Sequence, residues 1–306
     1  MRSAFVPLLA AAALLAGCST APVRSADEYF NEANDHYRAG GFTRAIENYR
    51  ELLDRHPFSD YTDEAELRIA HAHFLSEDYT SAVVALTDFQ RRHPTSEHLT
   101  LVGYLLGMCY VRQMGTVDRD QTSAQSAHTY FATLIHQYPQ SPFTDLARLE
   151  LADCRENLAA HELQVANFYA HRGNDAAAKV RLLSLSSKFS ETTTAADALL
   201  RLTQLYVEND NHEHATLALR ALESLHPNSS EARDARAIVN EQFSAKVPPT
   251  TDPLDLLMIA NGRRREETTF GLPKVPAVTE ERRVPQLGGS NIPRADPFGR
   301  GGSSPY

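Results

Sequence analysis

The motifs of common catalytic folds are missing from this sequence of 306 residues. Neither a GxSxG nucleophile elbow nor a P-loop occurs, and the acidic pairs are those that helix surfaces always supply. Of the thirteen histidines, His71-x-His73 and His212-x-His214 have a spacing of two, which points the rings about 200° apart on a helix. We therefore expect no enzyme, no metal site and no cofactor.

Basic residues are also in short supply. The chain has 30 Lys and Arg against 39 Asp and Glu, a net charge of −9. Residues 26–243 hold 19 basic and 32 acidic side chains, whereas residues 244–306 hold 9 and 7. An acidic main part argues against nucleic acid as the principal partner.

Long hydrophobic runs are absent except at the amino terminus. Phe5 to Leu15 is apolar, is interrupted only by Pro7, follows Arg2 and is too short to span a membrane. The next residues, Leu15-Ala16-Gly17-Cys18, resemble a bacterial lipobox, which predicts a signal peptide over 1–17, diacylglycerol and N-acyl lipid on Cys18, and a tether over 18–25. By lipoprotein sorting rules, the serine after the cysteine indicates the outer membrane. A plain secretory signal with an incidental cysteine is the alternative.

What the chain does contain is a repeated helical segment. Residues 42–57 are predicted to form a helix that ends at Pro57, and we call such a helix-ending position a stop. Five stops share the same upstream spacing, with a small residue twelve positions before and bulky residues eight and five before. The stops are Pro57, Pro94, Pro139, Ser190 and Pro227; the small residues are Ala45, Ala82, Ala127, Ala178 and Ala215; the bulky pairs are Tyr49 and Leu52, Leu86 and Phe89, Phe131 and Leu134, Leu182 and Leu185, and Leu219 and Leu222.

A second helical segment precedes each of these segments. Each repeat therefore has a first helix, A, and a second helix, B, which ends at the stop. The stops lie 37, 45, 51 and 37 residues apart, and such helix pairs are typical of tetratricopeptide repeats. We expect an all-α, TPR-like superhelical solenoid, with repeats one to three over 26–140 and repeats four and five plus a capping helix over 141–243. An ordinary helical bundle with chance spacing is the alternative.

Three details of the solenoid can be predicted. Asp27 is expected to cap the first helix, and one long helix is expected from Thr144 to His171 with Gly173 as its stop. Residues 244–306 hold nine of the sixteen prolines and are expected to form a disordered tail. Within it, Leu254 to Ile259 is an apolar island that either docks as a short helix or, as we expect, stays a fluctuating turn.

A TPR superhelix lines its groove with helix A side chains, which suggests a peptide-binding surface. The positions off the packing face are aromatic, aliphatic, amide and imidazole groups, which suit an extended peptide. The predicted groove residues are Phe30, Asn34, Tyr37, Leu67, His71 and Phe74. The alternative is that these side chains pack between repeats.

Two further cysteines, Cys109 and Cys154, fall on helix A of neighbouring long repeats. In an oxidising compartment they could pair. Two separate buried thiols are the expected arrangement, because solenoid helices rarely bring two chosen β-carbons within bonding range.

Several stretches together resemble the BamD family of outer-membrane assembly lipoproteins. They are His56 to Tyr61, His93 to Ser96, Asp118 to Asp120, Tyr138 to Ser141 and Asn167 to Gly173. The resemblance covers about residues 26–240, with Ser190 in place of a helix-ending proline and a tail longer than the family usually carries. It implies five TPR repeats in the complex that folds β-barrel proteins into the outer membrane.

The resemblance also implies partners. The amino-terminal repeats would receive an unfolded, aromatic-ended barrel substrate, and the carboxy-terminal repeats would hold the periplasmic domains of a BamA-type barrel insertase, beside other assembly lipoproteins. An arginine of repeat four contacts the insertase in the family, and the matching residue is Arg181. The protein would be lipid-anchored in the outer membrane and face the periplasm. The alternative is a TPR envelope lipoprotein that coordinates peptidoglycan synthesis or Tol-type machinery.

Overall fold

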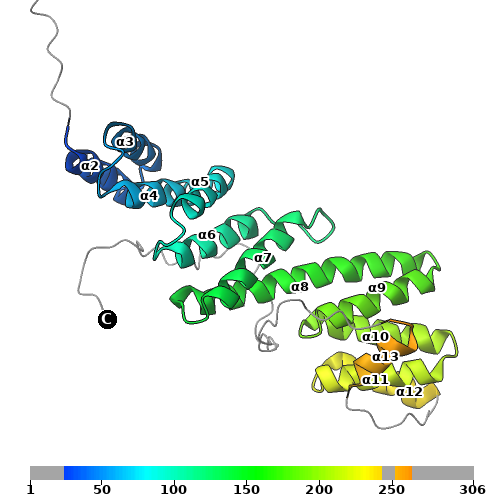
Figure 1. The fold of residues 1–306 in the computed structure, drawn as a ribbon. Helices are drawn as coiled ribbons and strands as arrows, with labels where there is room; N and C mark the ends of the chain where they lie inside the picture. Colours follow the sequence, from blue (N-terminus) through cyan, green and yellow to red (C-terminus); the bar gives the residue numbers. More distant parts are fainter. Residues whose placement is uncertain (1–23, 243–251, 264–306) are drawn as a thin grey trace, which may run out of the picture. The chain divides into compact units, whose positions relative to one another are not determined.

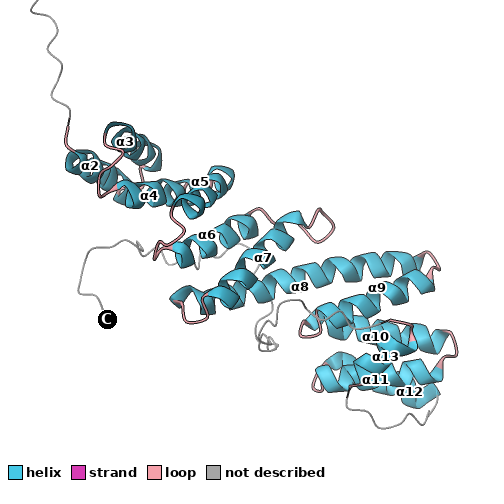
Figure 2. Ribbon diagram, in the orientation of Figure 1, coloured by secondary structure: helices cyan, strands magenta, loops and turns pink. Residues whose placement is uncertain are grey.

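The computed structural model describes residues 24–242 and 252–263, and in these ranges all regular structure is helical (Figures 1 and 2). The elements are α2 (Ala26–Arg38), α3 (Phe42–Arg55), α4 (Thr62–Leu75), α5 (Tyr79–Arg92), α6 (Leu99–Arg112), α7 (Thr122–Gln137), α8 (Pro142–His171), α9 (Asp175–Lys188), α10 (Thr193–Glu208), α11 (His212–Leu225), α12 (Ser230–Gln242) and α13 (Pro253–Ala260). The predicted signal peptide, Cys18 and most of the tether lie outside the described residues.

The chain divides into two compact units, Met1–Cys109 and Tyr110–Tyr306. In the first, α2 packs on α3, α3 on α4, and α4 on α5. In the second, each helix from α7 to α11 packs on the next, α12 covers α10 and α11, and α13 packs on α11. The division falls inside α6, whereas the sequence placed a boundary at residue 140.

The repeated positions form the core of every repeat. The five alanines twelve residues before the stops, Ala45, Ala82, Ala127, Ala178 and Ala215, all have 0% exposure. The bulky residues eight and five before the stops are buried as well, with Leu219 the most exposed of them at 7%. A small side chain lets the partner helix approach closely, and the bulky ones fill the space beside it. The all-α TPR-like fold is therefore confirmed.

Each helix B ends in the same way. The backbone N–H of His56, His93, Tyr138, Phe189 and His226 donates to the carbonyl four residues earlier, and the carbonyl of each accepts from the residue three later. The four residues that precede proline have ψ between 59° and 61°, whereas Phe189 has ψ 34°. Proline disfavours helical ψ in the residue before it, so Ser190 keeps the turn but relaxes that constraint.

A side-chain cap marks the start of the first helix A. The predicted cap Asp27 is wrong, because Ser25 accepts from the N–H of Glu28, and the Glu28 carboxylate accepts from the N–H of Ser25. Asp27 lies in the first turn of α2 and accepts from the hydroxyl of Tyr61. The long helix is confirmed as α8, which has 30 residues and starts at Pro142. Gly173 follows it with φ +72°, where a side chain would be strained.

The apolar island in the tail is a helix. Residues Pro253–Ala260 form α13, and Leu254, Leu257 and Met258 are buried in one cluster with the core of repeats four and five. The expectation of disorder is therefore wrong here, because the apolar face of α13 finds a surface on α11 that local sequence statistics do not reveal. The rest of the predicted tail, apart from its short helix and the flanking residues 252 and 261–263, lies outside the described residues.

Candidate functional site

The six predicted groove residues do not line an open groove. Their exposed fractions are 0% for Leu67, 3% for Phe74, 5% for Asn34 and Tyr37, 6% for His71 and 7% for Phe30. Side chains this buried cannot form the walls of a peptide channel. The alternative in which they pack within and between the repeats is the one that the structure shows.

Their contacts explain why they are buried. Tyr37 Oη lies 2.5 Å from His71 Nδ1, the ring of Phe30 stacks on Tyr61 at 4.3 Å, and Tyr49 donates to Asn34 Oδ1 at 2.5 Å. The guanidinium of Arg68 lies 5.4 Å from the centre of the Tyr37 ring. The first contact joins α2 to α4, and the second joins α2 to the residue that precedes α4, so the helix A faces of repeats one and two pack on each other.

An open surface in the first unit lies on the opposite, helix B side. Residues of α3, α4 and α5 enclose a hollow of about 440 Å³, which we call the B-face hollow. Its lining is Arg50, Leu53, Glu66, Ile69, His73, Thr80, Ser81, Val84, Ala85, Asp88 and Arg92. Val84 is 60% exposed there, although it is a large apolar residue. The hollow therefore combines an apolar floor with charged walls.

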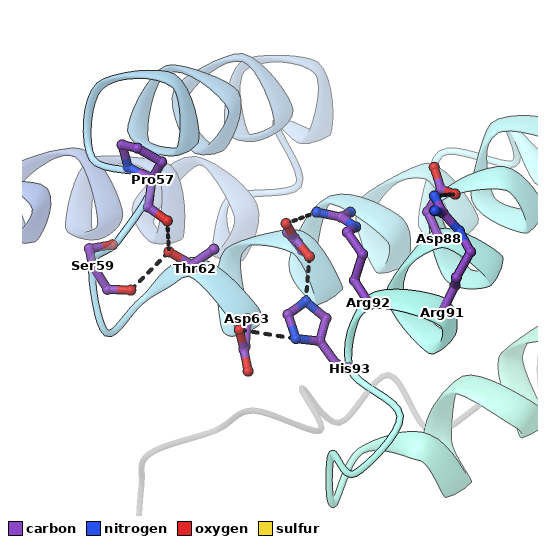
Figure 3. A network of polar contacts seen from close by, with 9 residues as sticks. Pro57, Ser59, Thr62, Asp63, Asp88, Arg91, Arg92 and His93 are labelled. Carbon is purple, nitrogen blue, oxygen red and sulfur yellow. Dashed lines mark hydrogen bonds and ion pairs between the residues drawn. The ribbon is translucent and has the colours of Figure 1, made fainter.

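One wall of the B-face hollow is held by an ionic network around the buried Glu66 (Figure 3). Its carboxylate pairs with the guanidinium of Arg92 and lies 2.7 Å from His93 Nε2, while His93 Nδ1 lies 3.2 Å from Asp63 Oδ1. The imidazole of His93 thus lies between the carboxylates of Glu66 and Asp63. The network fixes α5 to α4 and positions Arg92 at the rim.

The second unit has an open helix A surface of the kind predicted for the first. Between α8 and α10 lies a hollow of about 590 Å³, which we call the A-face hollow. Its lining is Ala160, Leu163, Gln164, Asn167, Phe168, His171, Thr194 and Asp197. Phe168 is 55% exposed, and the guanidinium of Arg172 lies 5.1 Å from its ring centre. Amides beside an exposed aromatic ring suit an extended chain with apolar anchors.

The floor of the A-face hollow is acidic at one end. Desolvation by its surroundings, with smaller contributions from Glu231 and Glu156, raises the pKa of Asp197. Glu156 also accepts hydrogen bonds from the N–H and hydroxyl groups of Thr193 and Thr194, at the start of α10. None of the residues predicted from the sequence to line a groove lies in this hollow. The available signal was that Gln164, Phe168 and Arg172 recur every fourth residue, which predicts one shared face at the end of the long helix.

Arg181, the predicted partner-binding residue, is exposed. It lies on α9 and donates to Glu162 of α8 at 3.0 Å, with 45% of its side chain accessible. Nothing in the described part of the chain buries or sequesters it. The position is open to a partner, and binding there stays a prediction.

Cys109 and Cys154 are buried free thiols rather than a disulfide. Burial raises the pKa of Cys109 to about 12, and burial, with help from Glu150 and Asp153, raises the pKa of Cys154 still further. Both thiols thus stay protonated and unreactive at neutral pH. Among the described residues, no group of three metal-ligating side chains is arranged to hold an ion.

Comparison with known proteins agrees with this architecture. The profile of the YfiO family, described as outer membrane lipoprotein, matches residues 22–210. The outer membrane protein assembly factor BamD of Pasteurella multocida is 26% identical over 211 residues, which cover 66% of this chain and 81% of the relative. The BamD of Vibrio cholerae is 28% identical, with 62% and 85% covered, and that of Caulobacter vibrioides 24%, with 76% and 75% covered.

Each of these relatives is named as an outer membrane protein assembly factor. None of the described helices is long and apolar enough to cross a bilayer. The family match extends from just beyond the lipobox to the turn after α10 and takes in both hollows and Arg181. With more than half of its length matched, the chain belongs to the YfiO family of outer membrane lipoproteins.

Proposed function

We propose that this protein is a non-enzymatic scaffold of the complex that assembles β-barrel proteins in the outer membrane. The observation that carries the proposal is the family match over 22–210, joined to relatives whose names are those of assembly factors. A lipid anchor on Cys18 would hold the protein at the outer membrane, facing the periplasm. Lasting attachment to a membrane needs two or more acyl chains, and the cysteine of the lipobox is the site that would carry them.

The unfolded barrel substrate would use the A-face hollow. An unfolded strand offers alternating apolar side chains and free backbone N–H and C=O groups. The ring of Phe168 provides an anchor for the former, and Gln164 and Asn167 provide donors and acceptors for the latter. The buried set in the first unit is no longer part of this proposal, because those side chains already contact one another.

The periplasmic domains of the insertase would contact the second unit at Arg181. A guanidinium can hold a carboxylate in a bidentate pair, and the present partner of Arg181, Glu162, is on the surface and easily exchanged. Exposed pairs of this kind contribute only about 0–1 kcal/mol to folding. Arg181 can therefore change partner at little cost in stability. Other assembly lipoproteins would join the same complex.

The test measures the two partners separately with the purified full chain. We expect Arg181→Glu to weaken binding of the insertase periplasmic domains at least tenfold, while Arg233→Glu, an exposed arginine on α12, leaves it unchanged. We expect Phe168→Ala to weaken binding of an unfolded barrel peptide, while Phe58→Ala, 98% exposed in the first unit, does not. Purification from detergent-solubilised membranes should recover the insertase.

Two results would contradict the proposal. One is recovery of a cell-wall synthase or a Tol-type protein in place of the insertase. The other is equal binding by all four variants, since neither surface would then contribute.

A further inference from the structure

The sequence of repeats one and two aligns with that of repeats four and five without a gap. Pro57 and Pro94 are 37 residues apart, as are Ser190 and Pro227, so equivalent positions differ by 133 in number. Helices α3 and α9 then coincide end to end, as do α5 and α11. Any residue of the first pair of repeats can therefore be compared directly with its counterpart in the second pair.

In the second pair, the helix B side is covered by α13. The hydroxyl of Tyr206 donates to Asn261 Oδ1 at 2.9 Å, and His214 Nε2 lies 3.5 Å from the carbonyl oxygen of Ala260. Leu202 and Leu217 are buried in the same apolar cluster as the inward face of α13. A short helix thus packs on the helix B side of repeats four and five and buries it.

The counterparts of these residues in the first pair line the B-face hollow. Tyr206 corresponds to His73, His214 to Ser81, Leu202 to Ile69 and Leu217 to Val84, and all four counterparts are in the lining. The difference is the cover: Leu217 is 3% exposed, whereas Val84 is 60% exposed. The B-face hollow is therefore the α13 site of the first repeat pair, left open.

The walls of the two sites differ in charge. Positions occupied by Leu183, Leu199, Ala221 and Leu225 in the second pair carry Arg50, Glu66, Asp88 and Arg92 in the first. Only the floor stays apolar, with Leu53, Ile69, Val84 and Ala85. A helix as apolar as α13, whose one charged residue is Asp255, would cover these charged walls with hydrocarbon. The occupant must carry a narrower apolar stripe with polar flanks.

The ion pairs made by the charged residues of the hollow indicate which charge the bound helix carries beside its apolar stripe. Arg92 pairs with Glu66, and Asp88 with Arg91 at 2.8 Å. Arg50 is exposed, and in the described part of the chain its side chain contacts His73 Nε2 at 3.4 Å. Of the two arginines in the lining, Arg92 thus has a carboxylate partner and Arg50, at the edge of an apolar floor, has a histidine in the described part of the chain. A carboxylate beside the apolar stripe would complement Arg50.

We infer that the B-face hollow binds a short amphipathic helix from a partner protein. The helix places two or three apolar side chains on Leu53, Ile69 and Val84, and an acidic side chain on Arg50. Its length is about two turns, like α13, and it seats between α3 and α5 as α13 seats on α11. This interaction is independent of the surfaces assigned above to the unfolded substrate and to the insertase.

The test uses two matched probes and a fluorescent reporter in the full chain. Both probes are the peptide of residues 252–263, stapled so that it is helical. One carries Leu256→Glu and Ile259→Glu, and the other carries lysine at the same two positions. Since the chain has no tryptophan, Thr80→Trp at the rim of the hollow gives a single reporter.

We expect the glutamate peptide to shift the Trp emission to shorter wavelength and to bind at least tenfold more tightly than the lysine peptide. Adding Val84→Arg should abolish binding, and adding Arg50→Glu should reverse the preference between the peptides. The matched control Val180→Arg, 40% exposed on α9, should change neither. Binding that ignores Val84→Arg, equal binding of both peptides, or an emission already shifted before any peptide is added would each overturn the inference.

Discussion

The phenol oxygen of Tyr37 lies 2.5 Å from Nδ1 of His71, 34 residues further along the chain. Both residues are nearly fully buried, so this contact is a polar joint inside the stack of repeats one and two. The neighbouring Phe74 stacks on His71 with ring centres 6.2 Å apart. The aromatic set that the sequence assigned to a binding groove therefore holds two repeats together.

The burial of Phe74 gives the first prediction. Phe74→Ala should lower the free energy of unfolding by about 3–5 kcal/mol, because a large side chain leaves a cavity in a closed core. Phe58→Ala, at a site 98% exposed, should change it by less than about 0.5 kcal/mol. Chemical denaturation of both variants is the measurement. A Phe74→Ala protein as stable as the parent would restore the groove interpretation.

The alanine of each repeat gives the second prediction. Ala178 has 0% exposure where α9 meets its partner helices, so Ala178→Leu should destabilise the protein by about 1–3 kcal/mol through overpacking. Ala176 is exposed two residues earlier on the same helix, and Ala176→Leu should be neutral. Thermal unfolding by circular dichroism compares the two. Equal effects would mean that the twelve-residue spacing does not mark the helix contact.

The docking of α13 gives the third prediction. Leu257 has 0% exposure and Ile259 55% on the same short helix. Leu257→Asp should release α13, because a carboxylate cannot be buried there without a partner, whereas Ile259→Asp should leave it docked. Hydrogen exchange of residues 253–260 reports the difference. Protection that survives Leu257→Asp would show that the apolar face does not hold the helix.

The cysteines give the fourth prediction. With Cys18 replaced by serine, the folded chain should resist thiol reagents at pH 8, since a pKa of about 12 leaves about one Cys109 in ten thousand as thiolate. A Phe58→Cys variant serves as the positive control, because that position is exposed. Fast labelling of the two native thiols would mean that they are reached by solvent.

The same raised pKa values predict how stability depends on pH. The folded state holds the thiol proton more tightly than the unfolded state, whose cysteines titrate near pH 8.5. The contribution of the two buried thiols to the free energy of unfolding is therefore complete below that pH. It is lost progressively as the pH rises towards 12. Denaturant midpoints at pH 7.5 and 10 should show this loss, and Cys109→Ala should reduce its size.

Much of the fold follows from local pattern. Pro57 and its four equivalents mark where each helix B ends, and Ala45 with Tyr49 and Leu52 marks the face that is buried. These features depend on contacts within a helix pair, and their spacing is written in consecutive residues. The long α8 and its stop at Gly173 were predictable for the same reason, since no proline or glycine interrupts residues 144–171.

The binding surfaces were less predictable. The distance from a stop predicts that Phe30 and Tyr37 lie off the face that packs on helix B of their own repeat. It does not predict whether Tyr61 and His71 of the next repeat contact them. Phe168 and Val84 are apolar like those residues and yet remain exposed. The difference lies in the distance between helices from separate repeats, which no local spacing encodes.

The sequence by itself determined the helix pairs, their ends, the family and the predicted site of lipidation, because each is carried by residues close together in the chain. Tertiary structure alone decided that the aromatic set of repeats one and two is core, that α13 covers the helix B side of repeat five, and that the equivalent surface around Val84 is open. Burial depends on which distant helix arrives at a face, and that is settled only when the repeats pack.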